Sequence, residues 1–240
     1  MKTTPLLALA LFVCGMSAAA AQDVAQAAAT TDATANVLAG TTPTKFLNNY
    51  TRLTPSLSSN NDFQSYTAVG VSARSLGRVV IMPIITFPEN ATFPYIDRAT
   101  MAELQSELMA EVNKVMQDKS IVVATPDQAD SIIQLAVTGV TAVEPDRRPR
   151  DYLPFRLITR PIKDATMGKE QEIRVTLELR IRNAKTNQTI FESLTRANGK
   201  TMGRADESNL RADIKELDPV LDTWTAQFRK SIATLQAAGK

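Results

Sequence analysis

The most regular pattern of apolar and polar positions covers residues 173–181. Apolar side chains from Ile173 to Ile181 alternate there with polar ones. A period of two is typical of a strand with one face on the core and the other in water. The pattern therefore predicts a half-buried antiparallel strand, with residues 189–195 returning as its hairpin partner after a turn at 183–188.

Three further segments have strand character. Residues 78–87 form a continuous apolar run, which predicts a strand buried on both faces, with Pro83 near its end or at a bulge. Residues 121–124 predict a short strand and residues 132–143 a longer one. With the hairpin, these segments make a sheet of about five strands.

Helical spacing of apolar residues occurs in three places. Residues 44–55 predict a short amphipathic helix docked on the core. A long helix is predicted to start after Asp97 or Thr100, and Thr100 would form a capping box with Glu103. The last helix is predicted to start with Asp218 as its cap and Pro219 in its first position. The three stripes are Phe46, Leu47, Tyr50 and Leu53; Leu104, Leu108, Val112 and Val115; and Leu221, Trp224, Phe228, Ile232 and Leu235.

These elements predict an α+β fold in one globular domain over residues 44–240. We expect a mostly antiparallel mixed sheet with two main helices packed on one face, and Trp224 in the core rather than in a ligand site. Residues 145–170 carry four prolines and many charges and are expected to be a long connection, and residues 199–208 a loop.

The first 21 residues have the layout of a bacterial secretory signal peptide. An apolar run ends at Val13, and small residues lead to a cleavage site after Ala21. Lipidation at Cys14 is the alternative, although the branched Val13 stands where a lipoprotein signal usually has Gly or Ala. Residues 22–43, rich in Ala and Thr, are expected to be a disordered tether. We expect an exported periplasmic protein, anchored to the outer membrane if Cys14 is acylated.

Composition excludes several function classes. The 240 residues contain no histidine and one cysteine, so Ser-His-Asp and Cys-His catalysis and nearly all zinc, copper and haem sites lack their ligands or bases. The net charge of +2 argues against nucleic acid as a partner. Nucleotide-binding glycine motifs, Ser-x-x-Lys and Asp-rich calcium loops are absent from the sequence. We expect no metal and no cofactor.

Two groups of residues could carry function. Glu170 with Glu172, and Asp127 with Asp130, could support glycoside hydrolysis if two carboxylates faced each other across a cleft. Solvated surface charge is the simpler interpretation, and no residue is assigned as catalytic. The better candidate is a basic segment with aromatic residues, which could bind an anionic polymer or a protein. Its residues are Arg147, Arg148, Arg150, Tyr152, Phe155, Arg156 and Arg160.

Residues 46–55, Phe-Leu-Asn-Asn-Tyr-Thr-Arg-Leu-Thr-Pro, resemble the opening of an uncharacterised bacterial envelope lipoprotein family, domain of unknown function number thirty-three thirteen. Residues 80–84, Val-Ile-Met-Pro-Ile, are similar to the buried strand of that family, and the order of the later elements agrees. The turn at 183–188 lacks the glycine of the family pattern, and the context of Cys14 departs from its lipidation signal. The resemblance implies a mixed sheet with helices on one face. It implies no activity, so it transfers no catalytic residue.

The sequence leaves three functional hypotheses. The first is a non-enzymatic envelope protein that binds an envelope protein or an anionic envelope polymer and meets the membrane only through a lipid anchor. The second is a carboxylate-based hydrolase of cell-wall glycans, and the third a small-ligand periplasmic carrier. The sequence does not indicate an oligomeric state.

Overall fold

A computed structural model describes residues 43–56, 62–71, 76–145, 170–202 and 211–237. Eight strands form one sheet in the order β1-β2-β8-β7-β6-β3-β5, with β4 pairing β6 beside β3. The fold is α+β, as predicted, but the sheet has more strands than five. The strands are β1 (Thr54–Pro55), β2 (Phe63–Thr67), β3 (Arg78–Ile81), β4 (Ile85–Thr86), β5 (Ile121–Val122), β6 (Ser131–Val143), β7 (Gln171–Asn183) and β8 (Thr189–Met202).

The sheet is built around three long antiparallel strands, β6, β7 and β8. β3, β4 and β5 are the parallel members, because β3 pairs with both β5 and β6 and β4 pairs with β6. The sequence did not predict β1 and β2. β1 has two residues, too few to show a period, and in β2 the two aromatic residues, Phe63 and Tyr66, are three positions apart and do not alternate. β8 also continues beyond Thr195 to Met202, so part of the loop expected at 199–208 is strand.

The apolar run at 78–87 divides into β3 and β4 around Pro83. Proline has no N–H for a sheet hydrogen bond. The pairing Ile81↔Ile133 is followed by Ile85↔Ala136, so this segment gains one residue on β6, as a bulge requires. The prediction of burial on both faces is confirmed for β3 at Val79 and Val80 but wrong for β4, whose Ile85 is 44% exposed.

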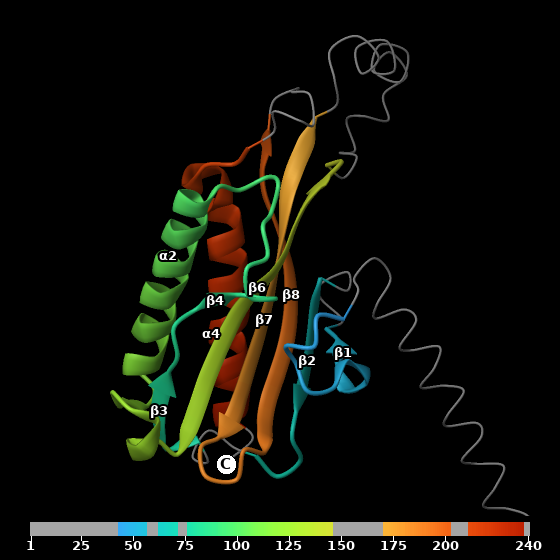
Figure 1. Cartoon of the computed structure of the whole chain (residues 1–240). Coiled ribbons are helices and arrows are strands. Elements are labelled where there is room, and N and C mark those ends of the chain that lie inside the picture. The colour runs from blue at the N-terminus through green and yellow to red at the C-terminus, as the bar shows by residue number, and fades with distance from the viewer. Residues whose placement is uncertain (1–42, 57–61, 72–75, 146–169, 203–210, 238–240) are drawn as a thin grey trace, which may run out of the picture.

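Two long helices cover one face of the sheet, as predicted (Figure 1). α2 (Arg98–Gln117) is capped by Asp97, whose carboxylate accepts from Thr100 N at 2.8 Å, so the alternative cap at Thr100 is wrong. α4 (Asp218–Ala237) directly continues a short 3₁₀ helix, Ile214–Leu217. The capping box of that short helix is Asp213 with Glu216. Asp218 is itself the first helical residue of α4, so the prediction that Asp218 caps the last helix and Pro219 takes its first position is also wrong.

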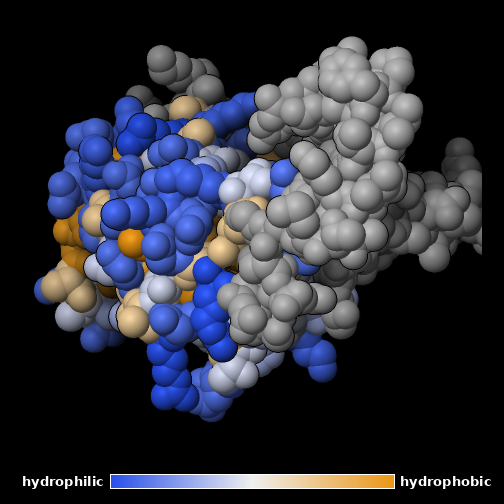
Figure 2. Space-filling model, turned by 90° about the horizontal axis from the view of Figure 1, so that it is seen from above, coloured by the Kyte–Doolittle hydropathy of each residue, from blue (hydrophilic) through white to orange (hydrophobic). Residues whose placement is uncertain are grey.

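The main core lies between these helices and the sheet, and it contains the predicted stripes of both. Trp224 is 2% exposed and stacks on Phe228 with ring centroids 5.0 Å apart, which confirms it as a core residue. Viewed from above, the described surface is mostly hydrophilic, with apolar side chains gathered at the left-hand edge, on the side of α2 (Figure 2).

The N-terminal segment, residues 43–55, lies against the opposite face of the sheet, where Figure 1 shows β1 and β2. The predicted amphipathic helix is wrong in its form, because only Tyr50–Arg52 is helical, as a 3₁₀ turn. Local side-chain bonds compete with the helix here: Thr44 Oγ1 accepts from Phe46 N and Asn49 Oδ1 from Thr51 N. The docking was nonetheless predicted correctly, and its apolar residues are buried with Ala136 and Leu194.

Candidate functional site

The basic segment that the sequence singles out lies outside the described residues. Arg147, Arg148, Arg150, Tyr152, Phe155, Arg156 and Arg160 all fall within 146–169, and Cys14 falls within 1–42. The strands that flank the basic segment are described. The last register pair of β6 and β7 is Val143↔Glu172, so both ends of the segment are fixed at the same end of the sheet.

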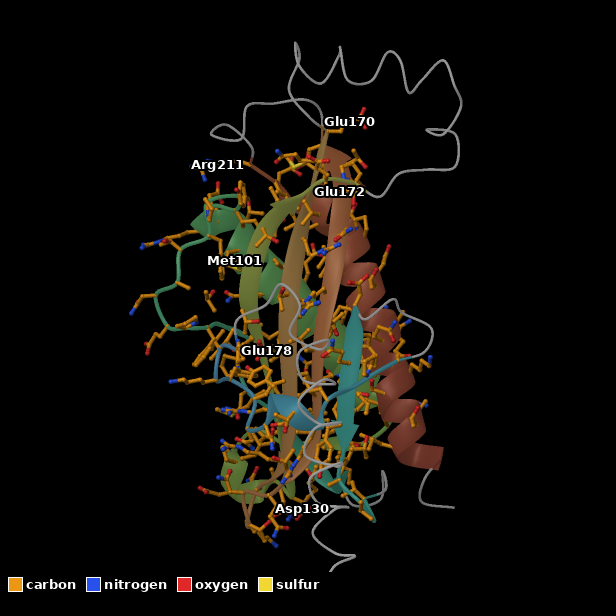
Figure 3. The ribbon with its side chains drawn as sticks, turned by 90° about the vertical axis from the view of Figure 1, so that its right-hand side faces the viewer. Met101, Asp130, Glu170, Glu172, Glu178 and Arg211 are labelled. Carbon is orange, nitrogen blue, oxygen red and sulfur yellow. The ribbon has the colours of Figure 1, made fainter. Side chains whose placement is uncertain are left out.

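The two carboxylate pairs lie at opposite ends of the sheet (Figure 3). Asp130 precedes the first residue of β6, and Glu172 pairs with the last. The 13 residues of β6 span about 40 Å at 3.3 Å per residue. The structure therefore does not bring a carboxylate of one pair opposite a carboxylate of the other.

Within each pair, one carboxylate already has structural partners. Glu172 accepts from Thr201 Oγ1 at 2.7 Å and from Asn198 Nδ2 at 3.1 Å. Asp130 accepts from Arg78 N at 3.0 Å, and that backbone bond, with the Arg78 guanidinium, holds the pKa of Asp130 below its usual range. An acid held ionised is unsuited to protonate a leaving group. Asp130 and Glu172 therefore make structural hydrogen bonds at the ends of strands, and they do not form a hydrolytic dyad with each other.

A cluster of buried polar groups lies on the outer face of the sheet, beneath the N-terminal segment. Glu178, in the middle of β7, is 0% exposed although the alternation predicted its face to be solvated. Tyr50 Oη donates to Glu178 Oε2 at 2.6 Å, and Thr138 Oγ1 donates to Oε1 at 3.0 Å. Thr44 Oγ1 lies 3.1 Å from each carboxylate oxygen. The half-buried prediction for this strand is therefore wrong at its centre, because the N-terminal segment covers it.

A second buried carboxylate extends this cluster to β8. Glu192 is 1% exposed, and Asn48 N donates to its Oε1 at 2.7 Å. Arg180 is its register partner on β7 and donates from Nη1 to Phe46 O at 2.7 Å, with its guanidinium 4.6 Å from the centre of the Phe46 ring. The N-terminal segment is thus held by hydrogen bonds from both directions across the interface.

Burial determines the protonation behaviour of these groups. It raises the pKa of both Glu178 and Glu192 above the ordinary value of a glutamate. Burial and the hydrogen bond with Glu178 raise the pKa of Tyr50 to about 12. Neither carboxylate lines either of the two grooves described next. The arrangement fastens the N-terminal segment to the sheet, and no substrate-sized space adjoins it in those grooves.

Two grooves of about 520 Å³ each are present among the described residues. One lies beside the first turns of α2, with Phe93, Ile96 and Met101 as apolar walls and Thr86 and Gln105 among its polar ones. Gln105 Nε2 donates to Thr86 Oγ1 at 3.2 Å, so two of these polar groups satisfy each other. The other groove runs between α2 and α4 and is strongly acidic.

The parts of the chain that the structure describes contain no group of three or more His, Cys, Asp or Glu residues that could hold a metal ion. The same parts contain no helix that is long and apolar enough to span a membrane.

Sequence reasoning missed the Glu178 cluster. The available signals were an apolar N-terminal stripe that needed a docking surface and a strand whose polar face carried Glu178 between Thr176 and Arg180. Neither signal shows by itself that the two would meet, since they are more than a hundred residues apart in the chain.

A family model described as "Protein of unknown function (DUF3313)" matches residues 42–228, which is more than half of the chain. The chain belongs to this family. The resemblance stated from residues 46–55 and 80–84 is therefore confirmed. The family model covers the N-terminal segment, the sheet and α4 as far as Phe228, so the Glu178 cluster lies entirely within the DUF3313 region.

No curated protein matches this DUF3313 chain. Among solved structures, it is similar to a hypothetical protein from Chlamydia trachomatis, with 12% identity over 68% of this chain and 96% of that one and a TM-score of 0.39. A DUF4136 family protein from Bacteroides thetaiotaomicron matches with 9% identity over 72% and 96% and a TM-score of 0.36. A lipoprotein from Neisseria meningitidis matches with 7% identity over 66% and 99% and a TM-score of 0.34. These likenesses are weak and carry no information about what this chain binds.

Proposed function

We propose that this DUF3313 protein is a non-enzymatic binding protein of the bacterial cell envelope. In this proposal the basic segment, Arg147 to Arg160, engages an anionic envelope polymer or a protein partner. The observation that supports it is the pairing Val143↔Glu172. Because of this pairing, the segment starts and ends next to each other on β6 and β7, two long paired strands of the sheet. Long connections on rigid scaffolds often carry binding function.

The location part of the proposal rests on the first 21 residues, whose layout is that of a secretory signal peptide. The intact mass of the protein from fractionated envelopes of its own host tests it. We expect a chain that begins at Gln22 in the soluble periplasmic fraction, or an acylated chain that begins at Cys14 in the membrane fraction. A full-length chain in the cytoplasm would refute export.

We propose that the protein has no hydrolytic activity, because one carboxylate of each candidate pair is hydrogen-bonded to neighbouring residues and the two pairs are far from each other. Asp130 is held by Arg78 and Glu172 by Thr201 and Asn198. The pairs lie at opposite ends of β6. Hydrolysis of purified peptidoglycan by the mature chain, abolished by Glu172→Gln, would overturn this part of the proposal.

Charge reversal tests the binding part. The variant Arg147→Glu, Arg148→Glu, Arg150→Glu should lose cosedimentation with purified anionic cell-wall polymer, or site-specific photo-crosslinks from residues 147–156 to an envelope protein. A matched control reverses Lys119, Lys185 and Lys230, three exposed cations outside the segment, and changes the net charge equally. If both variants bind as the wild type does, or both lose binding equally, the basic segment is not the binding site.

A further inference from the structure

The buried carboxyl group of Glu178 has hydroxyl groups, and no cation, as its bonding partners. The side chain is 0% exposed and lies in the middle of the sheet (Figure 3). Its partners are the hydroxyls of Tyr50, Thr44 and Thr138. Among the residues that the structure describes, no Lys or Arg forms an ion pair with it. Since buried charges are normally paired, a negative charge at this position is poorly compensated.

The same hydroxyl groups suit a protonated Glu178 equally well, because a hydroxyl both donates and accepts. Tyr50 Oη lies 2.6 Å from Glu178 Oε2 and 2.8 Å from Thr44 Oγ1. A protonated Glu178 donates to Tyr50 Oη, and the Tyr50 hydroxyl then turns its own hydrogen to Thr44. All three groups keep hydrogen bonds without a shift of any heavy atom. Tyr50 itself stays protonated, since burial raises its pKa to about 12.

The charged residues near Glu178 favour its neutral form. Burial is the main cause that raises the pKa of Glu178, and the negative charge of Glu192 on β8 adds to it. Glu192 is better compensated than Glu178. Burial raises its pKa too, but the N–H of Asn48 and the guanidinium groups of Arg180 and Arg52 oppose this effect. Glu178 is therefore the carboxyl group in this cluster that gains most from a proton.

The burial of Glu178 depends on the N-terminal segment, residues 43–55. Tyr50 and Thr44 belong to this segment, so two of the three hydroxyl partners leave if it detaches. The segment has few bonds to resist detachment: its one helical turn has three residues, and β1 pairs with β2 over two residues. Detachment admits water to Glu178, and its pKa then returns toward the ordinary value of 4.5. Docking of the segment is therefore linked to the uptake of a proton.

We propose that the N-terminal segment is a proton-linked strap, which docks most tightly when Glu178 is protonated and loosens as that proton is lost. Docking is strongest below about pH 4.5 and weakens as the pH rises through the pKa of the docked carboxyl group. An open segment uncovers Ala136 and Leu194, against which it packs, and leaves β2 as the edge strand of the sheet. The pH thus controls access to the outer face of the sheet.

The test is amide hydrogen exchange of the ¹⁵N-labelled mature chain between pH 4.5 and neutrality, with each rate divided by the intrinsic rate at that pH. Leu47 and Leu53 report on the segment, because their N–H groups donate to Tyr50 within it. Met82 N donates to Ile133 O and reports on the main sheet. As the pH rises, protection of Leu47 and Leu53 should fall by about threefold or more relative to that of Met82. An equal change at all three amides overturns the inference.

Two variants identify the group that carries the proton. Glu178→Gln keeps the shape of the side chain without its charge, and it should remove most of the pH dependence of Leu47 and Leu53. The matched control is Glu172→Gln, which removes a carboxylate of the same strand that bonds to Thr201 rather than to the segment. It should leave the pH dependence unchanged. If Glu178→Gln responds to pH as the wild type does, Glu178 is not the linked group and the inference is wrong.

A titration of the wild type gives a readout that does not require a variant to fold. The side-chain carboxyl carbon of Glu178 is followed by ¹³C NMR and assigned through bond correlations to its own amide. Its midpoint should lie above the ordinary value of 4.5. A midpoint at or below that value would show that docking takes up no proton there. This inference does not depend on the basic segment.

Discussion

The hydrogen bond between Tyr50 and Glu178 is the most direct point at which to test how the N-terminal segment is held. Tyr50→Phe removes one oxygen and keeps the ring that packs with Leu47, Leu53 and Leu194. The lost oxygen donates to Glu178 Oε2 at 2.6 Å, accepts from Leu47 N at 3.3 Å and lies at a hydrogen-bond distance of 2.8 Å from Thr44 Oγ1. Because the carboxylate is fully buried, water does not replace the missing donor without moving the segment.

The expected cost follows from these contacts. A hydrogen bond to a charged group contributes about 1.5–3 kcal/mol, and a buried group left without its partner adds to the loss. Glu178 keeps Thr138 and Thr44 as donors, so the penalty stays below that of an isolated buried charge. We expect Tyr50→Phe to lower the free energy of unfolding by about 2–3 kcal/mol.

The assay is urea unfolding at pH 7 followed by fluorescence of Trp224, the only tryptophan in the chain and a buried one. Hydrogen exchange of the Asn48 amide, which donates to Glu192 at 2.7 Å, reports whether the segment detaches before the core unfolds. The matched control is Tyr66→Phe, which removes a hydroxyl without a hydrogen bond among the described residues and should change stability by less than about 0.5 kcal/mol.

Two results would refute this reasoning. The first is a cost below about 0.5 kcal/mol with Asn48 exchange unchanged. The second is an equal cost of Tyr50→Phe in the wild type and in a Glu178→Gln background, because a true pair shows a coupling energy in the double-mutant cycle. Either result would mean that apolar contacts alone hold the segment.

Three further predictions concern pH and packing. Burial raises the pKa of Glu178, so the stability that its protonation contributes is full below the unfolded pKa of about 4.5 and is lost as the pH rises through the folded pKa. The unfolding free energy of the wild type should therefore fall relative to Glu178→Gln between pH 4.5 and neutrality, and a rising difference would reverse the sign of this argument. Gly199→Ala should cost about 1–3 kcal/mol in urea unfolding, since its Cβ would lie 2.5 Å from Glu216 O, whereas Gly139→Ala, with 3.3 Å to its nearest atom, should cost less. Trp224→Ala should cost about 3–5 kcal/mol, measured by circular dichroism, and a loss below 1 kcal/mol would place Trp224 outside the core.

Local patterns predicted those elements whose own residues decide their structure. The alternation at Ile173 to Ile181 gave β7, and the stripe with Trp224 gave α4, because a long periodic segment has one face that must be buried. The helix predicted at residues 44–55 failed for a local reason too. The side chains of Thr44 and Asn49 accept hydrogen bonds from backbone N–H groups in a non-helical backbone conformation. The spacing of apolar residues does not show that such side-chain bonds compete with the hydrogen bonds of a helix.

Contacts between segments that are far apart in the sequence cannot be predicted from the residue pattern of any one segment. The burial of Glu178 depends on Tyr50, 128 residues earlier, and the acidic groove depends on α2 lying beside α4 with Glu111 paired to Arg229. In each case the residue types are visible in the sequence, but their solvent exposure is not. Burying a charged group costs free energy unless it is paired, so burial decides which charged residues have a large effect on stability.

Periodicity and composition are sufficient to predict the α+β class, the core faces of the two long helices and the long strands, and the absence of histidine chemistry. They do not show which polar face is covered, how the strands of the sheet pair, or which carboxylates lie together. Those properties depend on packing between residues far apart in the chain, whose register is set by the whole sheet rather than by any one segment.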